Sequence, residues 1–203
     1  SNSTRGVRMG GLTPGRTNTM DYIEIATTGN ASDFGDLSAS TGDNAGLSST
    51  TRIVSGGGSA PGNVNVIEFI TTASVGNITD FGDLTEARRY LSGLSSSTRG
   101  VFYGGMQPNA SQVIDYITIA SAGNATDFGD PGTTPPADSF GCGASNSITG
   151  LFAGRNGSPI IEKITIASTG NGSTFGNLSA NKNNLAGNSN GHGGLSTTDF
   201  SQN

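Results

Sequence analysis

The sequence predicts an all-β fold built from four copies of one short-stranded repeat unit. A Gly-Asn-x-[Ser/Thr]-x-Phe-Gly motif recurs every 47 residues, with its asparagine at Asn30, Asn77, Asn124 and Asn171. Glycine accounts for 33 of the 203 residues and charged residues for only 12%, a composition typical of short strands joined by many turns. No long stretch places apolar residues at helical intervals, so we expect no substantial helix.

Each unit divides into four short strands, which are clearest in the third copy. We expect these strands within residues 90–94, 98–105, 113–120 and 126–130. A glycine pair ends the second strand, and the third strand alternates apolar and polar residues. The Gly-Asn step is predicted to form the tip of the hairpin between the third and fourth strands, because glycine supplies positive φ and asparagine tolerates it.

Two columns of large apolar residues recur in every copy and define the expected core. We predict that both columns are buried between sheets. The columns are Ile23, Ile70, Ile117 and Ile164, and Phe34, Phe81, Phe128 and Phe175.

A four-stranded sheet of this size cannot bury its faces alone, so the repeats must stack or form a ring of blades, as in a β-propeller. We expect residues 1–203 to form a single repeat domain, with repeats at about 3–47, 48–94, 95–144 and 145–195 and a tail at 196–203. The chain opens on a second strand, and residues 185–187 align with a first strand. A closed ring of four antiparallel blades is therefore expected, and an arc of a larger ring is the alternative.

The glycine pair, the four-strand unit and the period resemble the kelch repeat of galactose-oxidase-like propellers. The run from Gly104 to Asp130, with its IDYITIA and GNATDFGD segments, resembles repeats in uncharacterised tail-associated proteins of marine cyanophages. The tryptophan of the kelch fourth strand is absent, and the phenylalanine column takes its place. This resemblance implies a propeller in a virion, but it implies no copper enzyme, because galactose oxidase needs two histidines and this chain has one.

Charge and composition argue against several classes of function. The net charge of −5 and the absence of a long apolar run indicate neither nucleic-acid binding nor membrane insertion. Cys142 is the only cysteine, and the only histidine, His192, is flanked by glycines. We therefore expect no catalytic residues, no metal site, no cofactor and no enzymatic activity.

Two charged columns recur in register. They comprise Arg5, Arg52 and Arg99 on one side and Asp21, Glu68, Asp115 and Glu162 on the other. We predict a charged ring of pairs between strands or blades, with a ligand-binding funnel as the alternative. The aspartates that flank each Phe-Gly step are expected to cap turn amides rather than to bind calcium, since they lack the ligand spacing of a calcium loop.

The four asparagines of the motif each begin an Asn-x-Ser/Thr sequence and are candidates for glycan attachment. The leading hypothesis is a non-enzymatic structural or recognition module of a virion, a phage tail or fibre component that binds a host surface glycan. Its expected partners are other virion or surface proteins in a homo-oligomer or larger assembly. The alternative is an extracellular microbial surface or filament protein that carries N-linked glycans.

Overall fold

The computed structural model describes residues 4–133, 141–154, 157–182, 185–187 and 189, and in these segments it contains fifteen β-strands and no helix. The strands form four antiparallel sheets in which each strand pairs with its neighbour along the chain. The all-β fold predicted from the sequence is therefore confirmed. Within the described segments, no helix is long and apolar enough to cross a membrane.

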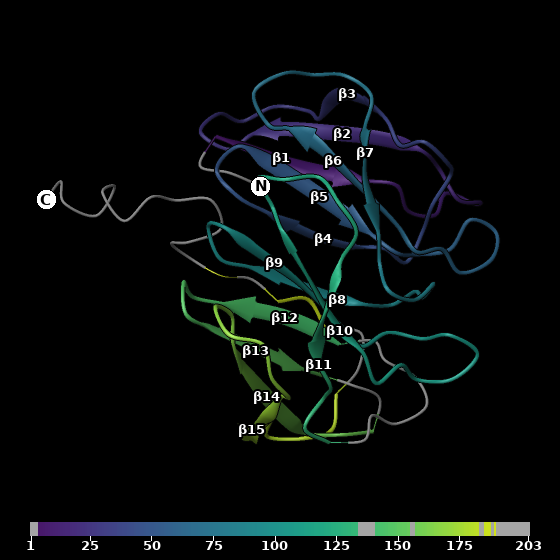
Figure 1. Ribbon diagram of the computed structural model, residues 1–203. Helices are drawn as coiled ribbons and strands as arrows, with labels where there is room; N and C mark the ends of the chain where they lie inside the picture. The colour runs from purple at the N-terminus through teal and green to yellow at the C-terminus, as the bar shows by residue number, and fades with distance from the viewer. Residues whose placement is uncertain (1–3, 134–140, 155–156, 183–184, 188, 190–203) are drawn as a thin grey trace, which may run out of the picture.

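Each sheet contains one copy of the motif, and the sheets follow one another in chain order (Figure 1). The second, third and fourth sheets begin at residues 45, 92 and 142, slightly before the expected repeat boundaries, and below a repeat means the residues of one sheet. The strands are β1 (Arg5–Met9), β2 (Thr19–Glu24) and β3 (Ser32–Asp36) in the first sheet; β4 (Ala45–Ser48), β5 (Arg52–Gly56), β6 (Val66–Thr71) and β7 (Thr79–Asp83) in the second; β8 (Ser92–Ser95), β9 (Arg99–Tyr103), β10 (Ile114–Thr118) and β11 (Thr126–Gly129) in the third; and β12 (Cys142–Ser145), β13 (Thr149–Ala153), β14 (Ile160–Thr165) and β15 (Ser173–Asn177) in the fourth.

A β-bulge lies at the same place in every repeat, between the third and fourth strands. In the second sheet Ile67 is opposite Gly82 and Glu68 is opposite Asp80, so Phe81 is the extra residue. The other three sheets have the same shift at the equivalent position. Because a bulge locally re-aims the side chain, it turns the phenylalanine toward the neighbouring sheet.

The core lies between sheets rather than within one. Each of three apolar clusters straddles two consecutive repeats; one of them joins Phe81 of the second repeat to Ile117 and Ile119 of the third. The burial predicted for the two apolar columns is confirmed for Ile70, Ile117, Ile164, Phe34, Phe81 and Phe128, which are at most 4% exposed. The exceptions are Ile23, at 48%, and Phe175, at 57%, one in each end repeat.

The four sheets form an open, propeller-like array rather than a closed ring. The first sheet lies at one end of the array and the fourth at the other (Figure 1). Residues 185–187 form no strand and do not complete the first sheet, which has three strands. The closure expected from the sequence is therefore wrong, and the open arc is what the packing produces.

Candidate functional site

The contact between each sheet and the next, called a junction below, gathers most of the recurring polar residues. The arginine column contributes one hydrogen bond to every junction, from Nη1 to a backbone carbonyl of the following repeat. The pairs are Arg5 to Thr72 (3.1 Å), Arg52 to Ile119 (2.8 Å) and Arg99 to Ile166 (2.9 Å). Each guanidinium also lies 4.3 to 4.8 Å from the centre of an aromatic ring in its own sheet, a cation–π geometry that fixes its direction.

The acidic column reaches back to the preceding repeat. Its carboxylates accept hydrogen bonds from the loop after the fourth strand of that repeat: Ser38 N to Glu68 (3.3 Å), Thr85 Oγ1 to Asp115 (2.6 Å), and Thr133 N and Oγ1 to Glu162 (2.7 Å each). Burial raises the pKa of Glu162, and the hydrogen bonds from the Thr133 and Gly132 amides oppose that shift.

The two charged columns do not form the predicted ring of ion pairs. Among the described residues the ion pairs are Arg5–Glu24, Arg8–Asp21 and Arg88–Asp115, and none of them joins the two columns. The reason is that each internal member of a column is engaged by a neighbouring repeat. Asp21 has no preceding repeat within this chain and pairs with Arg8 at the surface instead.

The asparagine column is hydrogen-bonded to the fourth strand of the preceding repeat. The hydrogen bonds between each Gly-Asn segment and that strand are called the clasp below. Asn124 Oδ1 accepts a hydrogen bond from the backbone N–H of Asp83 at 3.0 Å, and the same bond joins Asn77 to Asp36 and Asn171 to Asp130. Backbone bonds flank it: Gly123 N donates to Phe81 O (2.6 Å) and Ala125 N donates to Asp83 O (2.8 Å). The short Gly-Asn segment therefore pairs with the outer edge of the preceding sheet.

This placement corrects the predicted hairpin tip. The tight turn after the third strand comes earlier, for example where Ser121 N donates to Thr118 O at 3.0 Å. None of the four asparagines has positive φ; among the described non-glycine residues only Asp43 and Tyr90 do. Of the aspartates beside Phe-Gly, the second contributes its backbone N–H to the junction, as the donor to the asparagine Oδ1.

The glycine of the Phe-Gly step is required because the Gly-Asn segment of the following repeat passes close to it. A Cβ atom added to Gly82, which has φ +143°, would lie 2.6 Å from the carbonyl carbon and oxygen of Gly123. Gly35 and Gly129 are in the same situation against Gly76 and Gly170. The glycine of the Phe-Gly step is thus explained by the close approach of the following repeat.

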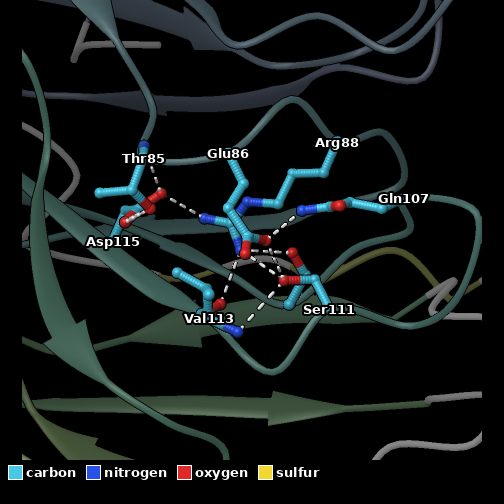
Figure 2. A network of polar contacts seen from close by, with 8 residues as sticks. Thr85, Glu86, Arg88, Gln107, Ser111, Val113 and Asp115 are labelled. Carbon is cyan, nitrogen blue, oxygen red and sulfur yellow. Dashed lines mark hydrogen bonds and ion pairs between the residues drawn. The ribbon is translucent and has the colours of Figure 1, made fainter.

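The second junction carries an additional buried network that sequence reasoning missed (Figure 2). Arg88 is fully buried and donates to Asp115 Oδ2 (2.6 Å) and to the carbonyls of Gly104 (2.7 Å) and Val113 (2.6 Å). Thr85 donates to the other carboxylate oxygen of Asp115. Nearby, the Glu86 carboxylate accepts hydrogen bonds from Gln107 and Ser111.

The network connects the loop that follows β7 with strand β10 and with the loop between β9 and β10. Burial lowers the pKa of Arg88, while the carboxylates of Asp115 and Glu86 act against that shift. The equivalent positions are Thr41 in the first repeat and Lys182 in the fourth, so the sequence shows no uniform column at Arg88. A further signal is the density of charge in residues 86–89, which the equivalent loops lack.

The inner edges of the sheets line a groove of about 290 Å³. Ser95 Oγ donates to Ser48 O (2.7 Å) and Ser145 Oγ donates to Ser95 O (3.0 Å), which joins the inner strands β4, β8 and β12. Small residues predominate along the groove: Gly46, Gly93, Gly143, Gly187, Ser48, Ser95, Ser145 and Ser189. None of the described residues that line it is titratable, so this described lining offers hydrogen-bonding groups and no acid or base.

Chemically, the recurring polar residues are engaged in holding repeats together. In the segments that the structure describes, no three acidic, cysteine or histidine side chains gather as a metal site. Burial raises the pKa of the Cys142 thiol, which disfavours the reactive thiolate. His192 lies outside the described residues.

No protein-family model matches the chain, and a search of curated proteins finds no significant match.

Proposed function

We propose that the chain is a non-enzymatic structural and recognition module of a virion, a phage tail or fibre component that binds a glycan of the host surface. The observation that carries the structural part is the use of the repeated polar columns. Arginine, acidic and asparagine side chains all bind backbone atoms of a neighbouring repeat. Such an array is stabilised by nearest-neighbour contacts and presents an extended surface.

The recognition part rests on a set of exposed loops between the second and third strands. The loops after β1, β5 and β9 project from the same side of the array (Figure 1). Each is closed by a short bridge, as between Met106 and Ala110, and each has a proline near its tip, at Pro14, Pro61 and Pro108. Their sequences differ from repeat to repeat. Loops that are held in place by a rigid scaffold commonly carry binding specificity.

The test is a binding and turnover assay on a panel of bacterial surface polysaccharides. We expect at least one polysaccharide to bind and to remain intact, and we expect binding to weaken when Gln107-Pro108-Asn109 is replaced by Gly-Ser-Gly. Peptides of the chain should also appear in purified virus particles. Release of reducing ends would contradict the non-enzymatic role, and absence of any binding would contradict the recognition role.

The alternative is an extracellular microbial surface or filament protein with N-linked glycans. It is favoured by one observation: Asn30, Asn77, Asn124 and Asn171 are all exposed. The clasp uses Oδ1, whereas a glycan is attached at Nδ2, so the two roles use different atoms. Intact mass distinguishes the proposals, since added hexose or N-acetylhexosamine on the protein from its natural source would support the alternative.

A further inference from the structure

The two ends of the array expose the surfaces that the internal junctions bury. At one end, the head face consists of Ile23, Ile25 and the segment 29–31 of the first repeat. Ile23 and Ile25 are 48% and 53% exposed, whereas their equivalents in the third repeat, Ile117 and Ile119, are 3% and 1% exposed. The head face therefore has the composition of a junction surface with no preceding repeat against it.

At the other end, the tail face of the fourth repeat is hollowed. A cavity of about 590 Å³ lies against Ala144, Asn146, Thr149, Leu151 and Phe175. Phe175 is 57% exposed, whereas Phe81 at the equivalent position is 2% exposed. At the internal junctions this phenylalanine packs on the isoleucines of the following repeat, as Phe81 does on Ile117 and Ile119.

Both ends of the array contain the glycine or Gly-Asn residues that form the clasp at internal junctions, but there these residues lack the clasp contacts. Gly176 occupies the position at which Gly35, Gly82 and Gly129 admit a following Gly-Asn segment, yet a Cβ atom on Gly176 would meet nothing within 4 Å. The three clasped glycines have φ of +135° to +143°, and Gly176 lacks a positive φ. Gly29-Asn30 is retained at the other end, and none of the described strands lies before it in the array.

The two ends also complement each other at the inner strands of the sheets. Gly187 lies beside β12, where a Cβ atom on it would be 2.3 Å from Gly143 O, as a Cβ atom on Gly143 would be 2.7 Å from Gly93 O. Residues 185–187 thus occupy the place of the inner strand of a following sheet. The first sheet is the one that lacks an inner strand.

From these observations we infer that the head face of one copy of this chain docks on the tail face of a second copy. In the joined pair, Ile23 and Ile25 fill the cavity beside Phe175, and Asn30 accepts a hydrogen bond from the backbone N–H of Asn177. The three-stranded sheet of one copy gains its inner strand from residues 185–187 of the other. Because the two surfaces differ, the contact is heterologous and can extend into a chain of copies.

Sedimentation velocity over a concentration series tests this inference. The average mass of the wild-type chain should rise above 20.3 kDa with concentration. Ile23→Asp and Phe175→Asp should each weaken association at least about tenfold, because each places a charge at the centre of an apolar contact. Val75→Asp is the matched control: Val75 is as exposed as Phe175 but lies in an internal turn.

Mixing the two variants distinguishes a heterologous contact from other modes of assembly. The Ile23→Asp chain keeps its tail face and the Phe175→Asp chain keeps its head face, so an equimolar mixture should form a 1:1 complex and nothing larger. Three outcomes would each overturn the inference. They are a wild-type mass that stays at one chain, as closure within one molecule would give; association unaffected by either substitution; and a mixture that forms no complex.

The inference concerns only the ends of the array and holds whether or not the chain belongs to a virion.

Discussion

Phe81 and Phe175 occupy the same position in the repeat, and they differ in what lies beside them. Phe81 sits between the second and third sheets and is 2% exposed, whereas Phe175 faces out of the fourth sheet at 57%. The strand pairing and the bulge are the same at both sites. Burial in this protein is therefore a property of the junction and not of the strand or sheet that carries the residue.

The charged residues show the same contrast. Asp115, inside a junction, is fully buried and binds Arg88 and Thr85. Asp21, its equivalent in the first repeat, forms an ion pair with Arg8 in which both side chains are more than one third exposed. Stability in a repeat array comes largely from interfaces between neighbours, so equivalent substitutions should differ in effect between internal and end positions.

The largest difference is expected for the phenylalanine column. Phe81→Ala removes a ring from a packed cluster and should lower the free energy of unfolding by about 3–5 kcal/mol. Phe175→Ala should change it by less than about 0.5 kcal/mol, because the ring is already in contact with water. Chemical denaturation at low protein concentration, where copies do not associate, measures both values. Equal losses at the two positions would mean that junction packing is not what stabilises the array.

Nearly as large an effect is expected when the buried ion pair is broken. Arg88→Met leaves the carboxylate of Asp115 buried without its cation, which should cost about 3–5 kcal/mol. Arg8→Met removes an exposed pair and should cost about 1 kcal/mol or less. Adding Asp115→Asn to Arg88→Met removes the uncompensated charge and should recover part of the loss. If the double variant is no more stable than Arg88→Met, the cost arises from packing and not from charge.

The repeat unit could be predicted from the sequence because its signals are local. The 47-residue period, the glycine turns and the apolar columns determine where strands lie, and all four strands expected in the third repeat are present. Partners across a junction are not local. The sequence predicts Asn124 at a hairpin tip because its preceding glycine suggests a turn, and nothing in the sequence shows that a strand of the preceding repeat reaches it.

Arg88 and the open ends illustrate two further limits. Arg88 has no counterpart at Thr41, so a search for repeated columns passes over it. Ring closure depends on the angle between neighbouring sheets, which results from many small packing contacts that no single column encodes. The sequence contains the residues that would seal a ring, but their presence does not determine whether the ends of one chain meet.

A smaller loss of stability is expected when the glycine that lies against the clasp is replaced by alanine. Gly82→Ala places a methyl group 2.6 Å from the Gly123 carbonyl, at a φ of +143° that other residues rarely adopt, and it should cost about 1–3 kcal/mol. Gly176→Ala has open space around it and no positive φ, so it should be neutral within about 0.5 kcal/mol. Denaturation midpoints of the two variants can be compared directly. A neutral Gly82→Ala would show that the clasp is looser than the hydrogen bonds indicate.

The smallest effect is expected from the clasp side chain itself. Asn124→Ala removes one exposed hydrogen bond, from Asp83 N–H to Asn124 Oδ1 at 3.0 Å, and should cost about 0.5–1.5 kcal/mol. Asn30→Ala should cost nothing measurable in the single chain, since no preceding strand lies against Asn30. Amide hydrogen exchange gives the more specific measurement: the Asp83 amide should exchange faster in Asn124→Ala and return to its original rate in Asn124→Asp, which restores an acceptor oxygen. Unchanged exchange at Asp83 would mean that the flanking backbone bonds of Gly123 and Ala125 hold this edge without the side chain.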